Sequence, residues 1–422
     1  MSGIFSKALL PRHAAMLWGL VVFLPVGMTY LAALLMLLAL FASGNLRERM
    51  ARLRASPVFW PVVVYVVWTL VVLALRPHYP QTLDNLWHGL RIAMTICMAM
   101  MLTRAEAVSA LRGFCVAAVI GVLLIAIAHT VGLPNFEAWS AIVRMTSNKS
   151  IADALLFAVL GSSAAVLGLA YLNERRCRGW VVMAFAIAAL AVVLVTLAIP
   201  SRTSLIGIGL AVCAACIHQW RARWGVLLAA VLVVIVVMTA SIWQAQAMRD
   251  KFELGVHELE QAQAGTVSEG SWVVRYYMYR DTTRMMLDRP LMGWGIGAWN
   301  TLWEERGPAL LRNYNMPHDD FLWMGSQAGI PGFMILLIIL LTSVVTCWRR
   351  PDLTGRLGLV ASLMLLIATS VHSAMRDAQI GLALPWITFV YLRLTLEPDC
   401  HWREVLPRRL TRADNRTAPS DG

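Results

Sequence analysis

The chain has 422 residues, of which 59% are hydrophobic and 14% are charged, and its formal net charge is +12. Together with a mean hydropathy of +0.65, this composition excludes an ordinary soluble domain. Apolar runs of about 17 to 25 residues recur along the sequence, and each could cross the roughly 30 Å hydrocarbon layer of a bilayer as a helix. Because the runs are continuously apolar rather than alternating, they predict an all-α membrane protein and argue against a β-barrel.

The first apolar block, residues 14–42, is too long for one upright span and short for two. At 1.5 Å per residue it would form a helix of about 43 Å. Basic residues flank it at Lys7 and Arg12 and again within residues 47–54, and such clusters mark the cytoplasmic ends of spans. A hairpin broken at Pro25 and Gly27 places both clusters inside, whereas one helix would separate them. The sequence therefore predicts a hairpin.

Further apolar runs predict the remaining spans. They cover residues 58–75, 87–103, 107–131, 152–172, 180–198, 203–219, 225–242, 319–346, 355–373 and 379–396. With the hairpin, about twelve spans result, and both termini are expected in the cytoplasm. The first apolar run continues well past the hydrophobic region of a typical signal peptide, so no cleavable signal peptide is expected.

This pattern divides the chain into four parts. Residues 1–242 are expected to form an N-terminal transmembrane bundle of about nine spans, 243–318 an outer helical subdomain, 319–396 about three C-terminal spans, and 397–422 a basic, disordered cytoplasmic tail. Most of the positive charge falls in the cytoplasmic loops and this tail. It indicates contact with anionic membrane lipids rather than with nucleic acid.

Two helices are predicted in the outer segment. Residues 244–264 carry apolar side chains at Met248, Phe252 and Val256, a spacing that favours a helix lying over the membrane face. A second helix is expected over 271–287, after a break at the intervening glycines.

Within the second predicted helix, Arg275 precedes Tyr279 by about one turn, so both side chains share a face. The glycines of residues 289–297 imitate a dinucleotide-binding loop, but no strand precedes them. They predict instead a tight turn that lets the backbone approach a neighbour.

Arginines at the predicted outer face run against the usual distribution of positive charge. Arg202, Arg275 and Arg376 are better explained as ligands for an anionic group. Only three of the 36 basic residues are lysines. The planar fork of arginine suits a diphosphate, although an arginine-rich genome would give the same bias.

The order of these features resembles a known family. Ser201-Arg202 ends a middle span on the outer side, Arg275 is followed by aromatic residues, residues 290–295 form a Pro-Leu-x-Gly-x-Gly turn, and His318 opens the next span. This order is similar to that of the O-antigen ligases, whose superfamily also holds O-antigen polymerases and bacterial protein O-oligosaccharyltransferases. By motif the resemblance covers the second half of the chain, and it implies a fold like the GT-C-type lipid-linked glycosyltransferases.

The resemblance implies a function and a place. O-antigen ligases transfer a glycan from undecaprenyl diphosphate to the lipid A core oligosaccharide, at the periplasmic face of the bacterial inner membrane. It implies that Arg202 and Arg275 bind the diphosphate and that His318 is catalytic. The family often has Asn after this histidine and Glu before a following glycine, where this chain has Asp319 and Gln327. The residue that orients His318 is therefore left open.

The chemistry of glycosyl transfer supports the same roles for these residues independently of the resemblance. An imidazole at His318 can accept the proton of an acceptor hydroxyl, and Asp319 or Asp320 could fix its tautomer. Arginines that neutralise the leaving diphosphate replace a metal ion, so we expect no metal and no cofactor. Three further residues could support the pocket, namely Tyr279, His372 and Arg376.

Other functions fit part of the same pattern. An O-antigen polymerase or a protein O-oligosaccharyltransferase would use the same donor with a different acceptor. A polytopic anion transporter would also place arginines and a histidine around an anion. Transporters usually show internal repeats and polar residues at mid-membrane, and neither is evident in this sequence.

Overall fold

The computed structural model describes residues 9–131, 151–174 and 177–398. Its N-terminal half contains α1 (Leu10–Val21), α2 (Val26–Ala42), α3 (Leu46–Arg54), α4 (Phe59–Leu75), α5 (Thr82–Met101), α6 (Arg104–Val131), α8 (Ile151–Ala170), α9 (Arg178–Val193) with the π-helical turn η2 (Leu194–Ala198), α10 (Arg202–Trp220) and α11 (Trp224–Gln244). The remaining elements are α12 (Gln246–Gln263), α13 (Ser271–Asp288), α14 (Ala298–Arg306), the 3-10 turn η3 (Ala309–Leu311), α15 (Asp320–Arg349), α16 (Leu353–Val371) and α17 (Ile380–Thr395).

Length and hydropathy make several of these helices able to cross a bilayer. Among the described residues, seven qualify, namely α6, α8, α9 with η2, α10, α11, α15 and α16. The pair α2 and α3, bent by 112°, would add one more, and α4 and α17 are shorter apolar helices. The chain is a multi-pass helical membrane protein, whereas the count of twelve spans stays a prediction.

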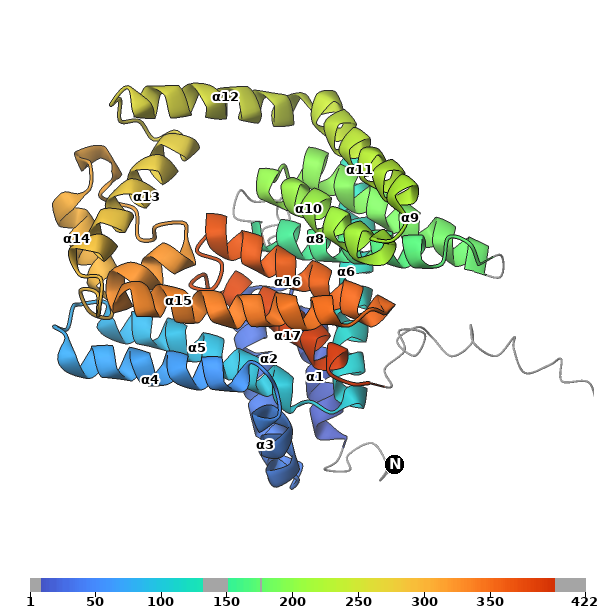
Figure 1. The fold of residues 1–422 in the computed structure, drawn as a ribbon, viewed down its shortest axis with the longest axis horizontal. Coiled ribbons are helices and arrows are strands. Elements are labelled where there is room, and N and C mark those ends of the chain that lie inside the picture. The colour runs from blue at the N-terminus through green and yellow to red at the C-terminus, as the bar shows by residue number, and fades with distance from the viewer. Residues whose placement is uncertain (1–8, 132–150, 175–176, 399–422) are drawn as a thin grey trace, which may run out of the picture.

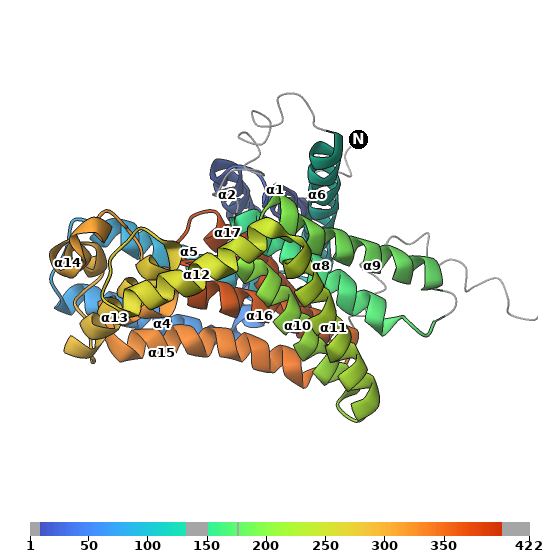
Figure 2. The ribbon, with the colours of Figure 1, turned by 90° about the horizontal axis from the view of Figure 1, so that it is seen from above.

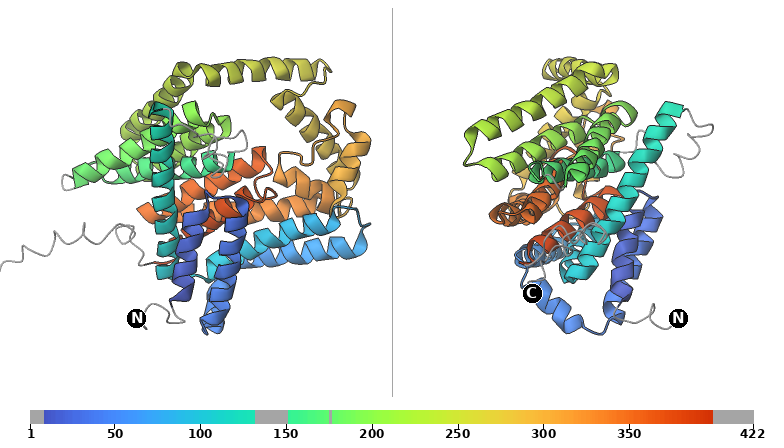
Figure 3. Two further views of the ribbon diagram at one scale, coloured as in Figure 1. Left: turned by 180° about the vertical axis from the view of Figure 1, so that it is seen from behind. Right: turned by 90° about the vertical axis from the view of Figure 1, so that its right-hand side faces the viewer.

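The predicted hairpin in the first apolar block exists as two helices. Val22 to Pro25 separate α1 from α2, and the extended backbone of Pro25 precedes the first turn of α2. At the back of the molecule, α1 packs against α6 on one side and against α2 on the other (Figure 3). With 12 residues, α1 is about 18 Å long, which is short of the hydrocarbon thickness. The break is therefore confirmed, but two spans are not established by it.

Burial separates the central helices from the peripheral ones. Every residue of α17 is buried, because α5, α6 and α16 surround it. In contrast, Leu227 is the one residue of α11 that is buried. An apolar helix so exposed is stable only where lipid covers it, which agrees with a membrane environment.

The two helices predicted in the outer segment are confirmed as α12 and α13. Figure 1 shows α12 along one edge between α11 and α13, and Figure 2 shows it crossing over the bundle. Its inward face differs from the expected apolar stripe, since Val256 is 55% exposed while Gly255 and Glu258 are buried. Besides apolar packing of Phe252 and Ala262, polar contacts that involve the candidate site hold α12.

Helix α15 is broken and folded back on itself at Gly329. The rings of Phe321 and Phe333 lie 5.5 Å apart, although twelve residues of continuous helix would separate them by about 18 Å. Gly329 has φ +73° and ψ −175°, and Pro331 provides no backbone N–H. The predicted continuous span over 319–346 is thus divided: residues 320–328 form a short returning helix, and 330–349 are long enough to cross the bilayer.

The basic tail predicted over 397–422 falls almost wholly outside the described residues, which end at residue 398. The cytoplasmic position of both termini stays a prediction. The division of the chain into the four predicted parts also stays a prediction.

Candidate functional site

Arg202 is the first residue of α10. Pro200 interrupts the chain after η2, and the Ser201 hydroxyl accepts a hydrogen bond from the Ser204 N–H at 3.2 Å, which caps α10. Because the helix begins here, the side chain of Arg202 leaves the end of α10 and reaches the outer helices.

Three contacts fix the Arg202 guanidinium. Nη1 donates to the Lys251 carbonyl oxygen in α12 at 2.6 Å, and Nη2 donates to Ser271 Oγ at the start of α13 at 2.9 Å. The guanidinium carbon lies 5.2 Å from the ring centroid of Trp272, within cation–π range. Arg202 therefore joins α10, α12 and α13 through neutral partners only.

Arg275 lies next to Arg202. Its Nη1 is 3.5 Å from both the Ser271 carbonyl oxygen and Ser271 Oγ, so the two arginines share one serine. Its Nε is buried and has no hydrogen-bond partner among the described residues. Burial is the main cause that lowers the pKa of Arg275. The structure thus brings together the two arginines that the sequence placed 73 residues apart.

His318 precedes the returning helix of α15 and has an unusual backbone. Among the described residues it is the one non-glycine residue with a positive φ, +58°, a conformation that side chains with a Cβ disfavour. The Tyr279 hydroxyl donates to the His318 carbonyl oxygen at 3.0 Å and stabilises this conformation. Burial raises the pKa of Tyr279, so the hydroxyl stays protonated and able to donate.

The imidazole of His318 lies near Arg275. Burial, followed by the positive charge of Arg275, lowers the pKa of His318 to about 4. At neutral pH the ring is therefore uncharged and can accept a proton. The charge of Arg275 thus acts on the His318 ring, whereas the convergence of His318 with both arginines stays a prediction.

A second histidine belongs to the same cluster. His372 follows α16, and its Nε2 lies 3.0 Å from the Thr203 hydroxyl in the first turn of α10. Burial, then Arg275, then His318, lowers the pKa of His372 to about 3. Sequence reasoning placed His372 correctly at this end of α16, but it did not identify Thr203, which no motif marks.

The two aspartates that follow His318 bind backbone groups. Asp319 Oδ1 accepts the Leu322 N–H at 2.8 Å and caps α15, and burial raises the pKa of Asp319 to about 6. Asp320 accepts the N–H groups of Met375 at 2.7 Å and Arg376 at 3.3 Å. Asp319 thus fixes the start of α15, and Asp320 joins it to the loop that follows α16. A pairing with the His318 ring stays a prediction.

Arg376 lies on the other side of the loop that contains His372. Its guanidinium is buried, and its strongest attractive partner is Asp84 in the first turn of α5. The loop is fixed from this side by Arg91 Nη2, which lies 2.8 to 2.9 Å from the carbonyl oxygens of Met375, Arg376 and Asp377. No contact that the structure describes joins Arg376 to His318, so its place in the pocket also stays a prediction.

The glycine-rich turn over residues 289–297 supports the returning helix. Trp294 N–H and Gly295 N–H each donate, at 3.0 Å, to the carbonyl oxygens of Ser326 and Gln327, which the break in α15 leaves free. A Cβ on Gly293 would lie 2.4 Å from the Gln327 carbonyl carbon. The predicted close approach of this backbone to a neighbour is confirmed, and Gln327 also accepts the Gly297 N–H with its side chain.

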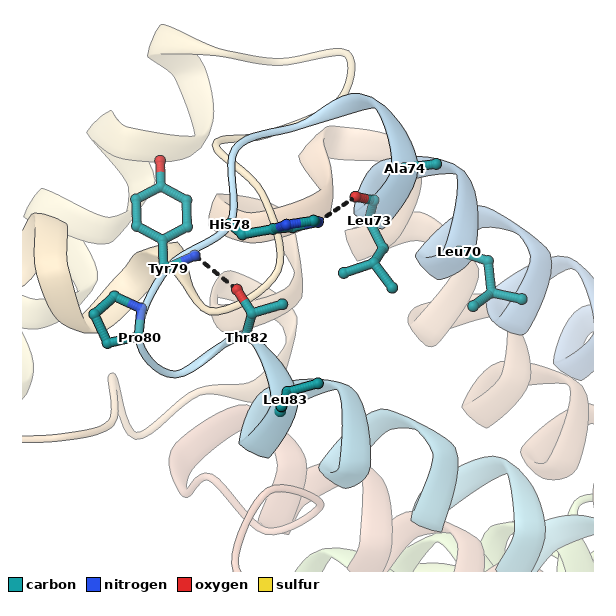
Figure 4. Close-up of a pocket in the computed structure, with 8 residues that line it drawn as sticks. All are labelled: Leu70, Leu73, Ala74, His78, Tyr79, Pro80, Thr82 and Leu83. Atoms are coloured by element: carbon teal, nitrogen blue, oxygen red, sulfur yellow. Dashed lines mark hydrogen bonds between the residues drawn. The ribbon is translucent and has the colours of Figure 1, made fainter.

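A lateral cavity of about 510 Å³ lies between the end of α4 and the start of α5 (Figure 4). Its lining is mainly apolar, with His78 and Tyr79 at the connecting loop. None of the predicted site residues lines it. Among the described residues, no group of three or more His, Cys, Asp or Glu side chains could hold a metal ion, and metal independence stays a prediction.

The fold and the site together define a class: a multi-pass helical membrane protein in which arginines and histidines converge at the ends of α10, α13, α15 and α16. Residues 188–337 match the family model described as O-antigen ligase, a stretch that contains Arg202, Arg275 and His318. This stretch of the chain is therefore similar to the O-antigen ligase family, which confirms the resemblance seen in the sequence. No curated protein matches the chain.

Proposed function

We propose that the protein is an O-antigen ligase, which transfers a glycan from undecaprenyl diphosphate to the lipid A core oligosaccharide. In this proposal the site faces the periplasm, at the outer surface of the bacterial inner membrane. The family match supports a glycosyltransferase of the ligase and polymerase type in general. The donor, the acceptor and the residue roles below belong to the proposal.

The arginine pair would bind the diphosphate of the donor. The observation that carries the proposal is that Arg202 and Arg275 meet at Ser271 with neutral partners, while Arg275 Nε has none. Two adjacent guanidinium groups repel each other, and a buried donor without a partner is costly. A diphosphate would relieve both costs, because its oxygens accept hydrogen bonds and carry the opposite charge.

His318 would act as the general base. An acceptor hydroxyl would give its proton to the imidazole as its oxygen attacks the anomeric carbon of the donor glycan. The bond from that carbon to the diphosphate oxygen would break with its electron pair, and undecaprenyl diphosphate would leave. Arg202 and Arg275 would stabilise the negative charge that grows on the leaving oxygen.

The basicity of His318 should differ between the free protein and the donor complex. In the free protein, burial and then the charge of Arg275 disfavour the imidazolium form, so the ring is unprotonated and able to accept a proton at neutral pH. Once the diphosphate neutralises Arg275, the imidazolium is less disfavoured, and the ring becomes a stronger base in the complex that reacts.

A reconstituted transfer assay tests the proposal. Purified protein in detergent would receive an undecaprenyl diphosphate glycan and lipid A carrying its core oligosaccharide, and we expect a glycan-bearing lipid A product. Elongation of a second lipid-linked glycan would instead indicate a polymerase, and glycosylation of a protein would indicate a protein O-oligosaccharyltransferase. Transfer in detergent without an ion gradient would exclude a transporter, whereas anion binding with no transfer to any acceptor would contradict the enzyme.

A further inference from the structure

Lys251 of α12 makes a reciprocal contact with the start of α10. Its Nζ donates to the Pro200 carbonyl oxygen at 3.0 Å, while its own carbonyl oxygen accepts from Arg202 Nη1 at 2.6 Å. The ammonium group therefore lies beside the first residues of α10, next to the proposed diphosphate site. It is one of only three lysines in the chain.

The positive groups at this junction outnumber the negative ones. Lys251 donates to a carbonyl oxygen, Arg202 to a carbonyl and a hydroxyl, and Arg275 lies near Ser271. Glu258 is the carboxylate that attracts both arginines, and it already accepts the Trp272 N–H at 2.8 Å. These three positive side chains and one carboxylate leave a net charge of about +2. A diphosphate diester carries a charge of about −2 and would neutralise it.

The position of Lys251 suits the same anion. The N-terminus of α10 contributes a partial positive charge at this point. Burial, followed by the positive charge of Arg202, lowers the pKa of Lys251. The Lys251 ammonium group lies near Arg202 and donates to the neutral Pro200 carbonyl. An anion bound here would stabilise its charge. Lysine also binds phosphate as a compact charge on a flexible stem, so it can leave the Pro200 carbonyl without a change in the helices.

We propose that Lys251 is a third ligand of the diphosphate, together with Arg202 and Arg275. This inference rests on the proposed function. On donor binding the ammonium group exchanges the Pro200 carbonyl oxygen for a phosphate oxygen. The residue thereby contributes to donor affinity, and it links α12 to the occupied state of the site.

Binding of undecaprenyl diphosphate to purified full-length protein in detergent tests this role. Lys251→Gln should weaken binding by about tenfold, and Lys251→Arg should restore most of it because the charge is retained. Arg249→Gln is the matched control, since Arg249 lies in the same helix with its guanidinium 6.0 Å from the Trp243 ring centroid. It should leave binding unchanged.

The dependence of binding on salt separates a ligand from a structural tether. If Lys251 contacts phosphate, Lys251→Gln should also flatten the loss of affinity with increasing salt, whereas loss of a tether would leave that slope unchanged and would overturn the inference. Equal binding by wild type and Lys251→Gln would overturn it as well. Failure of the wild type itself to bind undecaprenyl diphosphate would instead contradict the proposed function. Thermal unfolding of each variant verifies that it is folded.

Discussion

Arg49 and the arginine pair of the candidate site differ in the partners of their guanidinium groups. At the predicted cytoplasmic end, Arg49 of α3 forms a two-pronged salt bridge with Glu106 of α6 at 2.7 and 2.8 Å and also donates to Asn45 at 2.7 Å. At the candidate site, Arg202 and Arg275 have carbonyl and hydroxyl partners and no salt bridge among the described residues.

This difference separates structural arginines from arginines available to a ligand. A buried cation with its own carboxylate is neutralised within the protein, and the pair fixes one helix against another. A cation that has only neutral partners keeps its charge available. Side-chain type alone does not distinguish Arg49 from the site arginines, because all three are arginines outside the apolar runs of the sequence.

The largest expected effect separates the catalytic imidazole from the rest of the cluster. His318→Ala should reduce the rate of transfer by about 10²- to 10⁴-fold, because the acceptor hydroxyl loses its base. The rate is measured with purified protein, donor and acceptor. His257→Ala is the control, since His257 is 66% exposed on α12. Normal transfer by folded His318→Ala protein would refute the assigned role.

The next effect concerns the salt bridge between Arg49 and Glu106. Arg49→Ala would leave the Glu106 carboxylate buried without its partner, and it should destabilise the fold by about 3–5 kcal/mol. Unfolding in detergent measures this loss, with exposed Arg54→Ala in the same helix as the control. Donor affinity of the protein that remains folded should not change. A large loss of donor affinity with unchanged stability would reverse the comparison.

Removal of a site arginine should have the opposite pattern. Arg275→Ala should lower kcat/KM by about 10²- to 10³-fold because the leaving diphosphate loses a stabilising charge. Its effect on stability should be small, since no carboxylate would be left unpaired. Arg284→Ala provides the control, because that side chain of α13 is 68% exposed and pairs with Asp281. Strong destabilisation by Arg275→Ala would show that this arginine is structural as well.

The smallest effect is a shift in pH dependence. The pKa of His318 is lowered to about 4 in the free protein, and the base must be unprotonated, so kcat/KM should be lost as pH falls through about 4 and should be flat above. In the donor complex the diphosphate opposes Arg275 and raises the pKa of His318. The acid limb of kcat should therefore lie at higher pH than that of kcat/KM. The reverse order in measured pH–rate profiles would contradict the proposed charge coupling.

Much of the site could be predicted from the sequence because its main residues are charged and stand out in an apolar chain. The break at the glycines of 265–270 correctly delimited α12 and α13. Of the three outer-face arginines, the structure brings Arg202 and Arg275 together at Ser271. The sequence did not identify Thr203 or the proposed ligand Lys251, because a hydroxyl at a helix start and a lysine on a polar helix are common features without a ligand.

The fold-back of α15 was missed for a different reason. Residues 319–346 are long and apolar enough for one span, and hydropathy contains no information on direction. Gly329 and Pro331 were the available signals, but a glycine and a proline also occur in continuous membrane helices. The break depends on a distant partner, since the turn at 289–297 supplies the hydrogen bonds that residues 326, 327 and 330 lose.

Because α15 folds back, His318 lies at one end of the short helix 320–328, and Gly329 lies at its other end. The nine residues 320–328 form a rod of about 13 Å, so a rotation of about 10° around Gly329 would move the imidazole by about 2 Å. A misplacement of about 1 Å can cost a reaction about 10²-fold. The N–H groups of Trp294 and Gly295 fix the end of this helix at Gly329 by their hydrogen bonds. They therefore control the position of the His318 imidazole, which they do not contact.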